Sequence, residues 1–118
     1  MQRIMMKSKI HRAAVTGLEL DYPGSIAIDE DLLEAADILP GEQVHVVNVN
    51  NGERFVTYAI RGTRGRGGVV LKGAAARLAA KGDLVIIITY ASMEDAEAKK
   101  FRPRVALVDA TNHLIEKG

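Results

Sequence analysis

The sequence predicts one mainly β domain with short helices, and three observations lead to this fold class. Short runs rich in Val, Ile, Thr and Tyr are separated by Gly and Asn along most of the chain. Two of these runs flank Asn50-Asn51-Gly52, a sequence typical of a hairpin turn. A unit consisting of an Ala/Leu helix, a turn of Gly and an acidic residue, and a Val/Ile strand occurs twice.

The repeated unit bears on the architecture. The first copy reads LLEAADILPGEQVHVVNV, residues 32–49, and the second reads AARLAAKGDLVIIITY, residues 75–90. Two copies of one supersecondary unit favour a small barrel with an internal pseudo-twofold axis. Chance recurrence of a helix, a glycine and a strand is the alternative interpretation.

The first third of the chain is predicted to form three strands and a helix. The strands cover residues 2–9, 13–20 and 25–28, and the second of them alternates imperfectly. Asp29 is a suitable N-cap for a helix over residues 30–37. We expect the apolar side chains of this helix to share one buried face, and they are Leu32, Leu33 and Ala36.

The rest of the chain continues the β-rich pattern. The hairpin strands cover residues 43–49 and 54–60, and a Gly-rich basic loop follows at 61–68. A short strand at 69–71 precedes a small-residue helix at 73–80 and a buried strand at 84–90. We expect a short exposed helix at 94–100 and a last strand at 104–108.

Length and composition favour one small domain that gains stability by assembly. The chain has 118 residues, of which 47% are hydrophobic and 26% charged, the balance of an ordinary globular protein. Only 4% are aromatic and Trp is absent, so Val, Ile, Leu and Ala must build the core. A chain of this length buries a modest core, and oligomerisation is an economical way to add stability.

Several classes of protein are excluded or disfavoured. A formal net charge of +1 argues against a nucleic-acid partner, and the absence of Cys excludes disulfides and thiolate catalysis. No apolar run is long enough to span a membrane or to form a signal peptide, so we expect a soluble cytoplasmic protein. His45 and His113 have no neighbours at metal-ligand spacing, and we predict no metal site.

Gly24-Ser25 is the first candidate for chemistry. The preceding residues are Asp21-Tyr22-Pro23, a composition typical of a tight turn, and a turn serine at the start of a strand is the simpler interpretation. In the functional interpretation the Ser25 hydroxyl attacks the Gly24 carbonyl, because glycine has no Cβ to obstruct the approach. The resulting ester would eliminate to dehydroalanine, whose hydrolysis leaves a pyruvoyl group.

The strand after the hairpin turn carries a second candidate. Strand alternation places Arg54 and Tyr58 on one face, where a packed Tyr and a solvent-facing Arg are the simpler interpretation. The functional alternative is a guanidinium that binds a carboxylate beside a phenol that donates a proton. Thr57 falls on the opposite face, so a bulge, a strong twist or a neighbouring subunit is needed to bring all three into one pocket.

Three further segments have two interpretations each. Gly73-Ala74-Ala75 opens a helix whose free N–H groups suit an anion, although alanines also simply favour helix. Lys9, His11 and Arg12 form a cationic cluster, and most such clusters are solvated surface. The loop RGTRGRGG is similar to RNA-binding or phosphate-binding loops but lacks the P-loop Gly-Lys-Ser/Thr, so we expect a mobile surface loop.

The order and spacing of these segments resemble the aspartate 1-decarboxylase family over nearly the whole chain. Several ordered blocks at matching separations in a small chain form a specific signature. The matching blocks are Lys9-Ile10-His11-Arg12, Tyr22-x-Gly24-Ser25-x-x-x-Asp29, Asn51-Gly52-x-Arg54-x-x-Thr57-Tyr58-Ala59-Ile60, Gly73-Ala74-Ala75-Ala76, Gly82-Asp83 and Arg102-Pro103.

The resemblance implies a single double-psi β-barrel that cleaves itself into residues 1–24, the β chain, and residues 25–118, the α chain. It implies a homotetramer with active sites between subunits, and the conversion of L-aspartate to β-alanine and CO2 for pantothenate and coenzyme A synthesis. Ser25 would become the pyruvoyl cofactor that forms a Schiff base with the substrate amine. The conjugated imine would accept the electrons released with CO2, so pyridoxal phosphate is not needed.

The resemblance also assigns roles to side chains. Tyr58 would donate the proton to Cα, since a phenol with the ordinary tyrosine pKa of about 10 is protonated at neutral pH. Thr57 would bind substrate and assist the self-cleavage, and Arg54 would bind a carboxylate of the substrate. The remaining implied residues are Gly73, Ala74, Ala75 and Lys9 at the substrate, with His11 and Tyr22 in support.

The chain departs from the family pattern beside the cleavage site. Position 72 is usually Asn in the family and is Lys72 here, position 26 is often Cys and is Ile26 here, and Pro23 precedes Gly24. These residues bear on the rate of self-processing more than on the reaction. A binding module that uses the RGTRGRGG loop, and a purely structural oligomer, are the competing interpretations.

Overall fold

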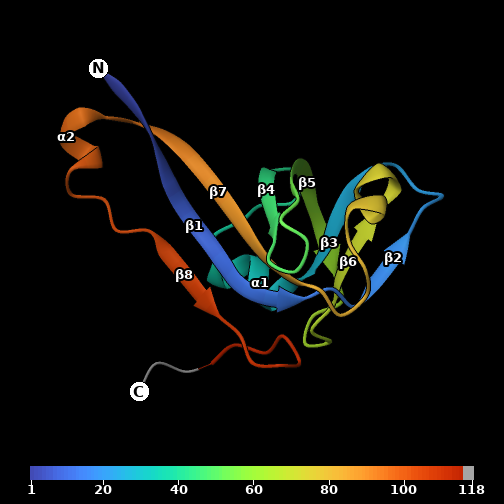
Figure 1. Cartoon of the computed structure of the whole chain (residues 1–118). Helices are drawn as coiled ribbons and strands as arrows, with labels where there is room; N and C mark the ends of the chain where they lie inside the picture. The colour runs from blue at the N-terminus through green and yellow to red at the C-terminus, as the bar shows by residue number, and fades with distance from the viewer. Residues whose placement is uncertain (116–118) are drawn as a thin grey trace.

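Strands make up about half of the chain, and eight of them form one continuous sheet in the order β2-β6-β3-β5-β4-β7-β1-β8 (Figure 1). The computed structural model describes residues 1–115. The strands are β1 (Gln2–Ala14), β2 (Gly17–Glu19), β3 (Ser25–Asp29), β4 (Gln43–Asn48), β5 (Arg54–Gly62), β6 (Val69–Lys72), β7 (Leu84–Glu94) and β8 (Arg104–Leu107). The helices are α1 (Glu30–Ala35), the 3₁₀ helix η1 (Gly73–Leu78) and α2 (Asp95–Ala98).

The sheet closes into a barrel because β1 and β2 are consecutive in the chain but pair with opposite parts of the sheet. β1 pairs with β7, and β2 pairs with β6. The link between them is itself hydrogen-bonded: Val15 N donates to the Asp83 carbonyl at 2.8 Å, and Thr16 N donates to the Val69 carbonyl at 2.8 Å. β8 lies outside this closure, parallel to β1. The fold is therefore mainly β with short helices, a double-psi β-barrel as expected from the sequence.

The strand pairing has the internal twofold relation that the repeated unit predicts. The parallel pair β3–β5 corresponds to the parallel pair β2–β6, and the antiparallel pair β4–β5 corresponds to β1–β7. The turns correspond as well: Gly41 N donates to the Ala59 carbonyl at 2.7 Å, and Gly82 N donates to the Val15 carbonyl at 2.8 Å. Both glycines have positive φ, 88° and 93°. The two halves of the chain thus build one barrel from the same unit.

The core fills the barrel with branched aliphatic side chains. Residues that alternate along the strands, such as Ile26 on β3 and Ile87 on β7, are fully buried. Val, Ile, Leu and Ala account for the core cluster, and Phe55 packs against it from a partly buried position. Within residues 1–115, no helix is long and apolar enough to cross a membrane.

The structure differs from the predicted elements at three places. The strands predicted at 2–9 and 13–20 are one long β1 followed by a short β2, because a register shift between Ile10 and Ala13, where Arg12 has a φ of 60°, lets the pairing with β7 continue. The helix predicted at 73–80 is a 3₁₀ helix that ends at Leu78. β7 extends beyond position 90, because its last residues pair with the start of β1 up to Gln2 opposite Glu94.

The basic loop predicted to be mobile is instead tied to the barrel. The buried Asp29 carboxylate accepts from Gly67 N at 2.7 Å and from Gly65 N at 3.1 Å, and it also caps α1. Asn112 Nδ2 donates to the Gly67 carbonyl at 2.8 Å. Arg64 of the same loop forms ion pairs with carboxylates of α1. The expectation of a mobile loop was therefore wrong, because a buried carboxylate elsewhere in the sequence needs these backbone donors.

Candidate functional site

The candidate site begins where the turn before β3 meets the start of η1. Ser25, the first residue of β3, pairs with Lys72 at the end of β6. Gly73 follows with a φ of 65°, and a Cβ atom on it would lie 2.6 Å from the Tyr22 carbonyl oxygen and 2.7 Å from Gly24 N. A side chain at position 73 is therefore incompatible with this contact. Glycine stands at position 73 because the backbone of η1 closely approaches the backbone of residues 22–24 here. The approached segment leads into the Gly24–Ser25 peptide.

A cavity of about 200 Å³ opens beside this contact. Gly24 and Thr57 line it together with two alanines of η1, so four of the residues singled out in the sequence share one pocket. The alanines leave room for a ligand because they present no more than a methyl group. The complete lining is Gly24, Phe55, Val56, Thr57, Ala74, Ala75 and Leu78.

The Ser25 hydroxyl is buried but weakly bonded. Its residue is 2% exposed, and its hydrogen bond to the Pro23 carbonyl is 3.5 Å long, at the outer limit for such a bond. No other hydrogen bond engages this oxygen in the described part of the chain. Its lone pairs are therefore not committed to a strong donor, as a nucleophile at this position requires.

Arg54 and Tyr58 lie on the other face of β5 from Thr57. The pairing of β5 with β4 is regular from Tyr58 opposite Gln43 to Arg54 opposite Val47, so strict alternation holds along this stretch. The Tyr58 residue is 40% exposed. The register shows no bulge in this stretch of the chain, so a bulge does not bring Thr57 to the face of Arg54 and Tyr58.

Lys9 lies on the same outer face of the barrel as Arg54 and Tyr58. Lys9 pairs with Ile88, Ile88 pairs with His45, and His45 pairs with Val56, so these residues form one lateral row across β1, β7, β4 and β5. Val56 shares its face with Arg54 and Tyr58 by alternation. The predicted residues thus divide into a group around Gly24 and Thr57 and a group on this outer face.

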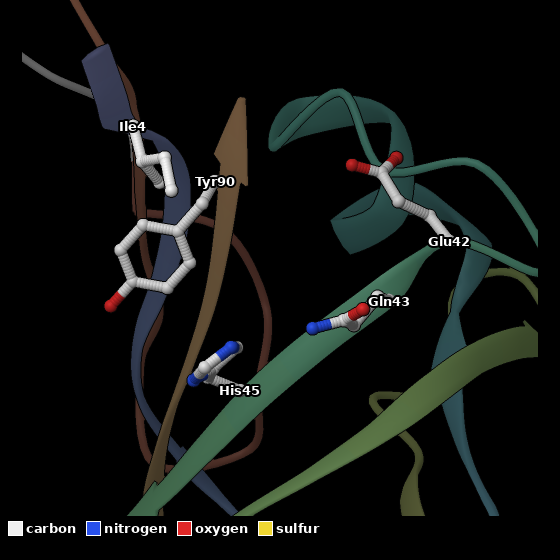
Figure 2. Close-up of a pocket in the computed structure, with 5 residues that line it drawn as sticks. All are labelled: Ile4, Glu42, Gln43, His45 and Tyr90. Atoms are coloured by element: carbon white, nitrogen blue, oxygen red, sulfur yellow. The ribbon is translucent and has the colours of Figure 1, made fainter. Parts of the chain in front are cut away.

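A larger cavity than the one beside Gly24 lies on that outer face. It measures about 430 Å³ and is lined by Ile4, Glu42, Gln43, His45 and Tyr90 (Figure 2). The Tyr90 and His45 rings meet edge to face with centroids 4.9 Å apart. Arg54 Nη2 donates to the Tyr90 hydroxyl at 2.8 Å. Tyr90 was missed from the sequence, since its contact with Arg54 depends on the strand order β5-β4-β7.

His11 and Tyr22 are placed differently from each other. His11 lines another cavity with Arg12, and its Nδ1 has no hydrogen-bond partner in the described residues. Burial lowers the pKa of His11, and the nearby charges of Lys9 and Arg12 lower it further. Tyr22 lies in the turn itself, where its carbonyl contacts Gly73. The structure therefore brings Tyr22, but not His11, to the candidate site within one chain.

Lys72 is engaged at the candidate site. Its ammonium lies 3.1 Å from Glu19 Oε2 and 4.6 Å from the centroid of the Tyr22 ring. The sequence flagged position 72 but gave no partner for it, because both partners come from segments about fifty residues away. Lys72 thus contacts the turn that precedes Ser25.

These features define a small β-barrel protein in which a Gly-Ser turn adjoins a cavity that is lined in part by alanines. A sequence model described as aspartate decarboxylase matches residues 1–115. The chain therefore belongs to the aspartate decarboxylase family.

Three curated relatives agree with this assignment over most of their length. A protein of Thermoanaerobacter pseudethanolicus named aspartate 1-decarboxylase is 61% identical over 115 residues, which cover 98% of this chain and 98% of the relative. One of Pelotomaculum thermopropionicum with the same name is 62% identical over 112 residues, 95% of this chain and 85% of the relative. A third, of Shouchella clausii, is 57% identical over 116 residues, 98% of this chain and 91% of the relative.

Proposed function

We propose that this chain cleaves itself between Gly24 and Ser25 and then converts L-aspartate to β-alanine and CO2, a step towards pantothenate. Family membership supports the reaction, because the relatives are named aspartate 1-decarboxylase. The contact of Gly73 with Gly24 carries the assignment of the site. It ties the turn at the scissile peptide to the start of η1, at a position where no side chain fits.

The proposed cleavage needs no other reactant than water. The Ser25 hydroxyl loses its proton and attacks the Gly24 carbonyl carbon, and the C–N bond to Ser25 breaks to leave an ester and a free amine. Loss of the Cα proton of Ser25 then expels Gly24 as a carboxylate and leaves dehydroalanine. Water adds to its imine form and ammonia departs, so residue 25 ends as a pyruvoyl group on the chain of residues 25–118.

The residues around Gly24 fit a small carbonyl-bearing group and its substrate. The cavity walls at Ala74 and Ala75 leave space beside the backbone that Gly73 keeps close. Thr57 places a hydroxyl in the same cavity, where it can polarise the Gly24 carbonyl during cleavage. Once formed, the pyruvoyl group supplies a carbonyl that accepts the electrons released with CO2.

Tyr58 is the proposed proton donor to the substrate. The parallel pairing of β3 with β5 begins at Ile26 opposite Ala59, so Ser25 and Tyr58 each precede the first pair and occupy neighbouring positions. The Tyr58 residue is also 40% exposed, so a ligand on this face can approach it. The phenolic O–H is a hydrogen-bond donor that can pass its proton to a reacting carbon within reach.

We propose a homotetramer whose active sites lie between subunits. Lys9 and Arg54 lie on an outer face, separated within one chain from the group around Thr57. A second copy that covers this face would bring a cation to the substrate's carboxylates. His11, with its unpartnered Nδ1 in the described part of the chain, is a supporting residue in the same proposal. The cytoplasmic location expected from the sequence stays a prediction.

Denaturing mass spectrometry of the purified protein tests the proposal. We expect fragments of residues 1–24 and 25–118, the larger one reacting with a carbonyl reagent. Ser25→Ala should remain intact and produce no β-alanine. Tyr58→Phe should cleave normally yet lose decarboxylation by about 100-fold or more, the usual contribution of a positioned proton donor. β-Alanine production by Ser25→Ala would refute the cofactor assignment, and full turnover by Tyr58→Phe would remove Tyr58 from its role.

A further inference from the structure

The turn that carries the scissile peptide is closed at both ends on one residue. Glu19, the last residue of β2, pairs with Lys72 in parallel, and Ser25, the first residue of β3, pairs with Lys72 in antiparallel. Residues 20–24 therefore form a loop that starts beside Lys72 on one side of β6 and ends beside Lys72 on the other side. The side chain of Lys72 lies under this loop, with its ammonium 4.6 Å from the centroid of the Tyr22 ring.

Few other contacts hold this loop. Within residues 1–115, the one side-chain hydrogen bond to residues 20–24 comes from the adjacent Ser25, whose hydroxyl donates to the Pro23 carbonyl at 3.5 Å. Leu20 and Tyr22 are exposed. Besides the close approach of Gly73, the contact between Lys72 and Tyr22 is a tertiary contact that can fix the loop's conformation.

The ammonium of Lys72 contacts the loop at two points. It is 3.1 Å from Glu19 Oε2 at the start of the loop and lies over the Tyr22 ring two residues before Gly24. A cation attracts both an aromatic face and a carboxylate. The side chain of Lys72 is 20% exposed and that of Glu19 is 43% exposed, so salt can still screen their interaction. An asparagine, with a single methylene, cannot reach both partners.

We propose that Lys72 is a positioning residue for self-cleavage, which holds the loop of residues 20–24 so that the Gly24 carbonyl stays within reach of the Ser25 hydroxyl. This inference rests on the proposed self-cleavage and extends it to a residue outside the family pattern. Ordering the loop before the attack lowers the entropy lost on reaching the reactive geometry, and the cleavage rate rises accordingly.

The test follows cleavage over time by denaturing mass spectrometry, from freshly made uncut protein. Lys72→Met keeps the apolar stem and removes the charge, and we expect about two- to fivefold slower cleavage from the loss of these partly exposed contacts. Lys72→Arg restores a cation and should cleave within about twofold of the unsubstituted rate. Equal melting temperatures of the three proteins exclude a general loss of folding.

A variant with both Lys72→Met and Tyr22→Leu tests whether Lys72 acts on cleavage through its contact with Tyr22. Tyr22→Leu removes the aromatic face and should slow cleavage as Lys72→Met does. The two substitutions together should be no slower than the slower single one, because they break the same contact. Added salt should slow the unsubstituted protein towards the Lys72→Met rate and leave Lys72→Met unchanged.

The possible failures are distinguishable. Cleavage of Lys72→Met at the unsubstituted rate, while Ser25→Ala stays intact, overturns the role of Lys72 and leaves the proposed function standing. The role is also overturned if the rate reductions of Lys72→Met and Tyr22→Leu multiply in full in the double variant, because the two residues would then act separately. An unsubstituted chain that never cleaves overturns the proposed function and this inference together.

Discussion

At the scale of single residues, Gly73 decides whether the candidate site can form. Its φ of 65° and the 2.7 Å between a Cβ at this position and Gly24 N leave no room for a side chain. The atoms in conflict are backbone atoms, which cannot rotate away as the end of a side chain can. The close packing of the turn on η1 therefore depends on the absence of a side chain at position 73.

Gly73→Ala should displace the turn and block self-cleavage. The added Cβ must push away Tyr22 and Gly24, and alanine at positive φ carries an additional strain of about 1 kcal/mol or more. We expect cleavage to slow by at least about tenfold, measured as the appearance of the fragment of residues 25–118. Gly68→Ala is the matched control, since a Cβ there meets nothing within 4 Å. Normal cleavage of Gly73→Ala would show that the contact with Gly24 is dispensable.

At the scale of elements, most of the secondary structure could be predicted from local sequence. The hairpin of β4 and β5, the Asp29 cap and the repeated unit depend on residues within a few positions of one another. The split of β1 and the state of the basic loop could not be predicted. The first depends on pairing with β7, and the second depends on Asp29 and Asn112, which lie far away in the sequence.

In the candidate site, too, some features could be predicted from local sequence and others could not. Gly24, Thr57, Ala74 and Ala75 were singled out by motif, and the structure gathers them around one cavity. The alternation of β5 correctly separated Thr57 from the other two residues of its motif. Tyr90 and the partners of Lys72 could not be found, because only the strand order places them. Local patterns thus identify chemical groups, and topology decides which of them meet.

Asp29 links three elements and should contribute to stability in a pH-dependent way. Burial raises the pKa of its carboxyl, but hydrogen bonds from the backbone of Gly67, Asp31 and Gly65 outweigh this effect and lower it overall. A lowered folded pKa means that the contribution is complete above the unfolded value, about 3.9, and is lost as the pH falls through the folded value.

Asp29→Asn should therefore destabilise the protein by about 1–3 kcal/mol at neutral pH, because its amide cannot accept from both loop donors on two oxygens. The comparison is best made by thermal unfolding in the uncut Ser25→Ala background, with the exposed Glu97→Gln as a control. The difference in stability that Asp29→Asn causes should shrink as the pH falls below about 4. A difference that stays constant down to about pH 2 would contradict the assigned role of the carboxylate.

At the scale of the whole molecule, the two steps of the proposed function have different structural requirements. The groups that cleavage uses, around Gly24, Thr57 and Gly73, lie together within one chain. The cations that decarboxylation uses, Lys9 and Arg54, lie on the outer face. In the proposed assembly, cleavage needs only the groups of one barrel, and decarboxylation also needs the cations that a second copy supplies.

Ile4→Glu should separate these two requirements. Ile4 is 80% exposed and lines the cavity of about 430 Å³ on the outer face, beside the Tyr90 that Arg54 contacts. If this face is the proposed subunit interface, a carboxylate buried there should weaken assembly at least about 100-fold, equivalent to about 3 kcal/mol. Light scattering should report fewer than four chains per particle, while Ile4→Val remains a tetramer. We expect Ile4→Glu to retain self-cleavage and to lose decarboxylation, and dissociated chains with full turnover would contradict active sites shared between subunits.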